Sequence, residues 1–134
     1  MRDVKVTRLM WLLLLLISSG CRVEPTNRNQ EQPVTSPSGK YVLTVPIERA
    51  QDDHLYWRVT ISGASGQVLF KDDSRFVGNL NVYWCWDDHD RVWLENSDDG
   101  RTYYWELDEQ NRWRRYQWEP DPKCLFPPRR LYRK

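Results

Sequence analysis

The chain carries two histidines and several clustered carboxylates, the residue types that general acid–base catalysis requires. His54 and His89 are the only histidines in 134 residues, and each stands beside acidic residues. The glycine-flanked serine of residues 63–66 lacks the spacing of a nucleophile elbow, and no helical pattern follows it. We therefore predict no catalytic residue and a protein that is not an enzyme. A small hydrolase or an enzyme inhibitor is the less favoured alternative.

Two acidic loops raise the question of calcium, which takes oxygen ligands from closely spaced carboxylates. The loops are Asp-Asp-His-Asp at residues 87–90 and Asn-Ser-Asp-Asp-Gly at residues 96–100. Neither has the full alternation of a calcium loop that ends in a bidentate glutamate. Aspartate and glycine are also the residues that hairpin turns prefer. We interpret both loops as turns and predict neither a metal site nor a cofactor.

Eight tryptophans are the most unusual feature of the composition. Successive residues of a strand point to opposite faces of a sheet, so the aromatic residues after position 83 supply rings to both faces. We expect one face to lie in the core and the other to form an aromatic platform that binds a protein partner or stacks on sugar rings. The alternative is that the C-terminal tail covers the rings. The platform is assigned to Trp84, Trp86, Trp93, Trp105 and Trp113.

These side chains must be positioned by strands, because apolar residues alternate with a period of two through most of the chain. No window after Gly20 has the pattern of an amphipathic helix. The sequence predicts an all-β domain, a small antiparallel meander of about seven strands that forms a twisted sheet, a small sandwich or an open barrel. The expected strands cover residues 40–47, 55–62, 67–71, 81–86, 91–95, 102–107 and 112–118.

Composition divides the chain around this domain. Residues 21–33 are polar and lack aromatic residues, which indicates a flexible tether before the domain of residues 34–118. Residues 119–134 form a proline-rich basic tail. Residues 21–110 hold nine Lys and Arg against sixteen Asp and Glu, whereas residues 111–134 hold eight against two. An acidic body argues against a nucleic-acid partner.

The N-terminus has the pattern of an export signal. Basic residues precede an apolar run of nine residues at positions 9–17, too short to cross a membrane that needs about 20. The small residues 18–20 before Cys21 resemble the lipobox of bacterial lipoproteins. The resemblance implies that residues 1–20 are a lipoprotein signal peptide, that Cys21 is acylated and that the protein is held on a membrane. Arg22 after the cysteine favours the outer membrane in a Gram-negative bacterium. The alternative is an ordinary cleavable signal or a signal anchor.

If Cys21 carries the lipid, Cys85 and Cys124 are left in an oxidising compartment. We predict a disulfide between them, because small exported domains use such bonds for stability. The bond would close a loop of roughly 40 residues and contribute roughly 3–4 kcal/mol. Two separate thiols are the alternative. No paired cysteines or clustered histidines indicate zinc.

Residues 36–41, Ser-Pro-Ser-Gly-Lys-Tyr, resemble the turn that opens blades of Tol-type and Trp-Asp-repeat propellers. Residues 84–106 have a similar blade-like sequence pattern, but the chain is long enough for only about two blades. The whole chain resembles small bacterial lipoproteins of uncharacterised function, which supplies no site residues. We predict a lipid-anchored envelope protein that acts as a non-enzymatic binding module. Its partner would be another envelope protein, or alternatively a glycan or peptidoglycan.

Overall fold

The computed structural model describes residues 32–79, 81–120 and 125–132. Within these ranges the protein is all-β, as predicted, and its one helical element is the 3-10 helix η1, Arg129–Tyr132. The strands are β1 Val34–Thr35, β2 Tyr41–Thr44, β3 Ile47–Arg49, β4 Leu55–Trp57, β5 Thr60–Gly63, β6 Val68–Lys71, β7 Phe76–Val77, β8 Val82–Trp86, β9 Val92–Asn96, β10 Arg101–Leu107 and β11 Trp113–Trp118. The predicted signal peptide, Cys21 and nearly all of the tether lie outside the described residues.

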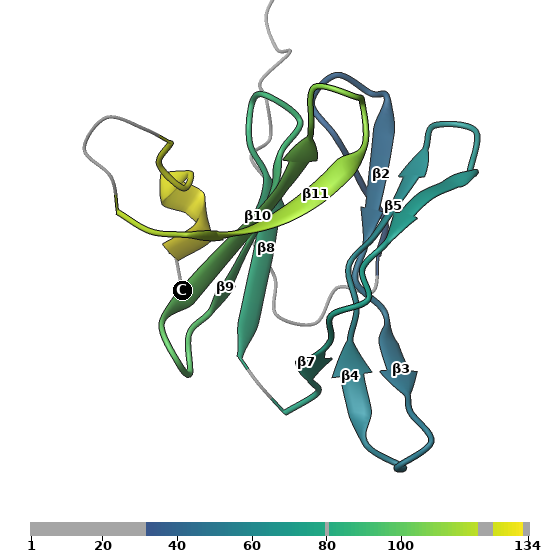
Figure 1. Ribbon diagram of the computed structural model, residues 1–134, viewed down its shortest axis with the longest axis vertical. Helices are drawn as coiled ribbons and strands as arrows, with labels where there is room; N and C mark the ends of the chain where they lie inside the picture. The colour runs from purple at the N-terminus through teal and green to yellow at the C-terminus, as the bar shows by residue number, and fades with distance from the viewer. Residues whose placement is uncertain (1–31, 80, 121–124, 133–134) are drawn as a thin grey trace, which may run out of the picture.

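The strands form three antiparallel sheets (Figure 1). One sheet has the order β1-β2-β5-β6, the second β3-β4-β7, and the third β11-β10-β9-β8. The third sheet is the meander that the sequence predicts, since each of its strands pairs with the next along the chain. The first is not a meander, because the β3–β4 hairpin is inserted between β2 and β5.

Within the described ranges, eleven strands are present in place of the predicted seven, because one long hairpin that bends across two sheets supplies two of the additional strands and the two-residue strands β1 and β7 supply the others. The expected strand 40–47 divides into β2 and β3 around Pro46, and the expected strand 55–62 divides into β4 and β5 around Arg58. Proline has no amide hydrogen for a ladder bond. The Pro46 carbonyl nevertheless accepts a hydrogen bond from the Arg58 amide, at 3.1 Å, so the two arms stay joined at the bend. The lower arm of the hairpin, β3 and β4, points away from β2 and β5 in Figure 1.

A single core joins the three sheets. Leu43 and Ile61 from the first sheet, Trp57 from the second and Trp105 from the third belong to one buried cluster. A buried polar contact ties the sheets further, because the Trp105 indole N–H donates to the Asp72 carboxylate at 2.6 Å. Among the described residues, no helix is long and apolar enough to span a membrane.

Candidate functional site

The β8–β11 sheet has an inner face toward the core and an outer face away from it. The register places Trp86, Val92 and Trp105 in one row, and the adjacent row holds Cys85, Trp93 and Tyr104 on the opposite face. The first row belongs to the main core, whereas the second belongs to a smaller cluster with the C-terminal tail. The inner face therefore packs in the main core and the outer face packs against the tail, and each predicted tryptophan lies on one face or the other.

Four of the five tryptophans assigned to the platform lie on the inner face and are core residues. Their exposed fractions are only 0–7%. A small domain has few large apolar residues with which to fill its interior, so these indoles are buried in the core and are not exposed to a ligand. The prediction that they form an exposed stacking surface is therefore corrected. The four are Trp84, Trp86, Trp105 and Trp113.

Trp93 lies on the outer face but is also fully buried. Its indole N–H donates to the Asp87 carboxylate at 3.0 Å, and Leu131 of the tail packs in the same cluster. The tail therefore covers this ring, which is the alternative that the sequence left open. None of the five tryptophans presents its ring to solvent.

The tail returns to the outer face and ends in η1, drawn in yellow in Figure 1. η1 contacts β8 and β9. Leu131 is 1% exposed, and the Trp118 indole donates to the Leu125 carbonyl at 2.6 Å. Arg130 donates to the Trp86 carbonyl. Phe126, by contrast, is exposed and takes no part in the covering.

Cys85 is a free, buried thiol beneath this tail. Burial raises its pKa to about 11, against the opposing hydrogen bond and charge of Arg130. The structure thus departs from the predicted Cys85–Cys124 disulfide and holds Cys85 as a small apolar residue packed with Trp93. Cys124, like Cys21, lies outside the described residues.

A ladder of three rings crosses the outer face on neighbouring strands. Trp93 of β9 stacks on Tyr104 of β10 with ring centroids 5.0 Å apart, and Tyr104 stacks on Tyr116 of β11 at 5.1 Å. These spacings match the distance between neighbouring strands. Exposure rises along the ladder, from the buried Trp93 to Tyr116 at 38%. Tyr104 and Tyr116 were not among the predicted binding residues. The alternation of side chains along residues 113–118 does, however, place Tyr116 on the face of the sheet opposite to that of Trp113.

Beside the ladder runs a row of ion pairs. Arg91 contacts Asp87 at 2.7 Å and Glu106 at 3.8 Å, and Arg114 contacts Asp108 at 3.1 Å. Burial alone would raise the pKa of Asp87, but hydrogen bonds from Trp93, Arg91 and backbone amides outweigh it and lower that pKa. The Arg112 amide and the Arg114 side chain hold the pKa of Asp108 at about 2. Both carboxylates therefore stay ionised and fix the ends of their hairpins.

The acidic loop 87–90 is organised as a turn. The Asp87 carboxylate accepts hydrogen bonds from the amides of His89 and Arg91, at 2.8 and 3.0 Å. His89 is exposed on this turn. In the part of the chain that the structure describes, His, Cys, Asp and Glu do not gather in a group of three that could hold a metal ion.

Among the described residues, β11 ends the sheet with an open edge, since β10 is its one neighbour there. Four consecutive residues, 114–117, are exposed on this strand. Arg115 lies over the Tyr103 ring, 5.3 Å from its centroid, while Arg114 and Tyr116 face outward in the register. This edge strand therefore combines a free side for backbone pairing, two arginines and the last ring of the stack on one exposed surface.

Comparisons with protein families, with curated proteins and with solved structures find no match.

Proposed function

We propose that this protein is a non-enzymatic binding module of the bacterial envelope, and that it docks an extended segment of a partner protein along the β11 edge. The observation that carries the proposal is the run of four exposed residues, 114–117, on a strand with one neighbour. A partner strand added there gains main-chain hydrogen bonds, and its side chains determine specificity.

The edge defines the chemistry of its partner. Tyr116 ends the ring ladder, so an aromatic residue opposite it on the added strand continues the stack at the same spacing. Arg114 lies on the same face as that ring, where it also pairs with Asp108, and Arg115 lies on the opposite face, so the two arginines favour acidic residues on both faces of the added strand. A second copy of this chain fits poorly, because antiparallel pairing of two β11 strands brings four arginines together. The partner is therefore a different protein with an acidic, aromatic strand.

Crosslinking in intact cells tests this docking. A photoreactive phenylalanine analogue at Tyr116 is expected to capture a discrete envelope protein. The same analogue at Val68, which is 59% exposed on the edge strand β6, serves as the matched control. Capture should weaken with Arg115→Glu and persist with Arg115→Lys. Absence of an adduct at position 116, or equal capture at position 68, would refute docking at β11.

We also propose that Cys21 carries a lipid that holds the domain on the membrane, at the outer membrane in a Gram-negative cell. The support is the basic and apolar leader before Cys21. More than one acyl chain gives durable anchoring, at about 0.8 kcal/mol for each buried methylene. Cys21→Ser is expected to abolish labelling by a palmitate analogue and to release the protein from the membrane fraction. Retained labelling would show that the acylated residue is another one.

A further inference from the structure

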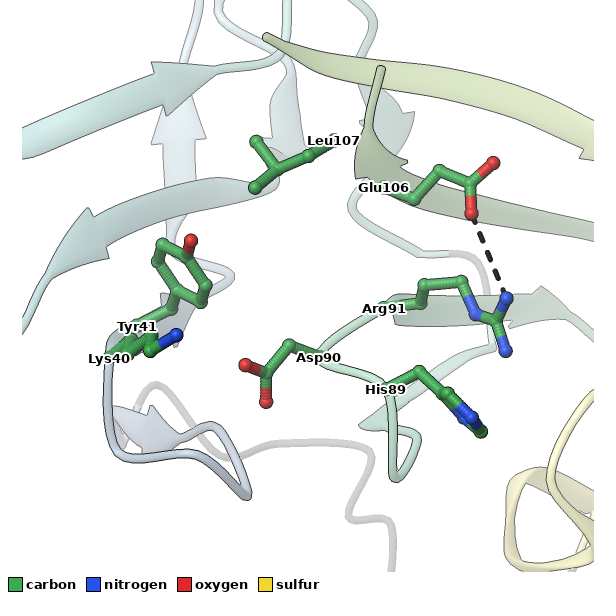
Figure 2. A pocket seen from close by; sticks show the side chains of 7 residues that line it. All are labelled: Lys40, Tyr41, His89, Asp90, Arg91, Glu106 and Leu107. Atoms are coloured by element: carbon green, nitrogen blue, oxygen red, sulfur yellow. Dashed lines mark ion pairs between the residues drawn. The ribbon is translucent and has the colours of Figure 1, made fainter. Parts of the chain in front are cut away.

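A cavity of about 300 Å³ lies apart from the ring ladder, where the β8–β9 hairpin and β10 approach the turn before β2. Figure 2 shows Tyr41 and Lys40 on one side, Glu106 and Arg91 on the other, and Asp90 between them. The cavity is lined by Lys40, Tyr41, His89, Asp90, Arg91, Glu106 and Leu107. Its volume is at the lower end of the range for small-molecule sites.

The apolar wall of this cavity is held rigidly. Tyr41 packs edge-to-face on Trp113 at 5.1 Å between ring centroids and lies nearly parallel to Trp86 at 6.4 Å. Both indoles are core residues, so they fix the position of the tyrosine ring before any ligand arrives. Leu107 extends the wall. A preorganised wall lowers the ordering cost of binding.

The polar groups of the cavity are balanced in sign, and three of them, Asp90, Glu106 and Arg91, are held by neighbours. Asp90 accepts a hydrogen bond from the Ser38 amide at 3.1 Å, which joins the two turns across the cavity. Its carboxylate points toward the side of Lys40 and Tyr41, whereas Glu106 points toward Arg91 (Figure 2). Two carboxylates and two cations line the cavity, so a ligand with charge of one sign only meets a like charge for every opposite one. A neutral ligand with many hydroxyl groups can donate to the carboxylates and accept from the cations.

We infer that this cavity binds one unit of a neutral saccharide, with the sugar's C–H groups against Tyr41 and Leu107 and its hydroxyls donating to Asp90 and Glu106. The aromatic and aliphatic wall favours the C–H face of a sugar ring over a phosphate or a cation, and the balanced charge gives no net attraction to a ligand of one sign. This inference does not depend on docking at β11. A protein with both sites would join a glycan to a protein partner in the envelope.

Calorimetric titration of the full chain in detergent micelles tests the inference. The probes are three neutral tetrasaccharides: cellotetraose, maltotetraose and N-acetylated chitotetraose. At least one is expected to bind with one-to-one stoichiometry. Asp90→Asn and Glu106→Gln should each weaken binding by about tenfold or more, because hydrogen bonds to charged groups are strong. Asparagine suits the positive φ of residue 90, 57°, and its amide oxygen can still accept from Ser38, so the turn should persist.

Glu109→Gln, an exposed carboxylate in the β10–β11 turn outside the cavity, is the matched control and should leave the affinity unchanged. Three results would each overturn the inference. They are failure of all three sugars to bind at 10 mM, equal affinity of the wild type and the two cavity variants, or binding of glycine or inorganic phosphate in preference to a neutral sugar. None of these results would affect crosslinking at position 116, so the two proposals fail separately.

Discussion

Asp87 shows how one carboxylate can organise a strand end. It accepts hydrogen bonds from the Trp93 indole, the Arg91 side chain and two backbone amides, and it is 7% exposed. Asp87→Asn replaces one accepting oxygen with an NH₂ group that faces the donors of Trp93 and Arg91. We expect a loss of about 2 kcal/mol in the free energy of unfolding at pH 7, measured by urea titration. Asp88→Asn, a neighbour whose side chain is 88% exposed, should cost almost nothing.

The stability difference between the wild type and Asp87→Asn is expected to depend on pH. The folded-state pKa of Asp87 is lowered, so its contribution is fully present above its unfolded pKa of about 3.9 and is lost as pH falls through the folded pKa. The stability gap between wild type and Asp87→Asn should therefore be constant from pH 5 to 7 and shrink below pH 4. A gap that widens in acid would show that the carboxylate is not stabilised in the folded state.

Several features at the residue scale follow from the sequence, but exposure does not. Alternation predicts correctly that the aromatic residues occupy both faces. It cannot say that Trp105 is covered by another sheet or that Trp93 is covered by η1, because both covers come from distant segments. The exposed member of the ladder is Tyr116, whose distinction is that β11 is an edge strand. Edge position is a property of the assembled sheet.

At the scale of elements, the sequence predicts turns well because their chemistry is local. Asn111 ends the β10–β11 turn with a positive φ of 57°, a conformation that asparagine and glycine tolerate. Its amide donates to the Asp108 carbonyl at 2.9 Å. Asn111→Val should lower stability by about 1–2 kcal/mol, whereas Asn111→Gly should be nearly neutral, as measured by thermal unfolding. Equal stability of the two variants would contradict the strained geometry.

The bend at Pro46 was harder to foresee than the turns. An unbroken alternation from Lys40 to Ile47 predicts one strand, and only the pairing of β2 with β5 and of β3 with β4 in separate sheets reveals the break. A proline within a strand pattern is a signal of interruption, but it does not say which sheet each half joins.

η1 acts as a cover for the outer face, which gives it a measurable effect on Cys85. Leu131 is almost fully buried against the Cys85 and Trp93 cluster. In a chain with Cys21→Ser and Cys124→Ser, Leu131→Ala should lower stability by about 2–4 kcal/mol and accelerate labelling of the Cys85 thiol by a disulfide reagent. Phe126→Ala, at a residue 62% exposed on the same tail, should change neither quantity. Unchanged labelling in Leu131→Ala would mean that η1 does not shield the thiol.

On the scale of the whole molecule, one core shared by three sheets implies that they unfold together. The buried contact between Trp105 and Asp72 joins the third sheet to the segment after β6. Loss of the Trp105 indole would leave a buried carboxylate oxygen of Asp72 without its hydrogen-bond donor. Trp57 provides a matched comparison. It is buried to a similar degree, but its indole N–H has no hydrogen-bond partner within the described part of the chain.

Trp105→Phe and Trp57→Phe remove the same volume, yet only the first removes a hydrogen bond to a charged group. We expect Trp105→Phe to cost about 2 kcal/mol more than Trp57→Phe in urea unfolding followed by circular dichroism. Fluorescence and circular dichroism should report one coincident transition for both variants, because the shared core couples the sheets. Equal losses of unfolding free energy in the two variants would show that Trp105 stabilises the fold by packing alone. Separate transitions would show that the sheets fold independently, and the cavity between the β2 turn and β10 would then lose the rigid wall on which sugar binding depends.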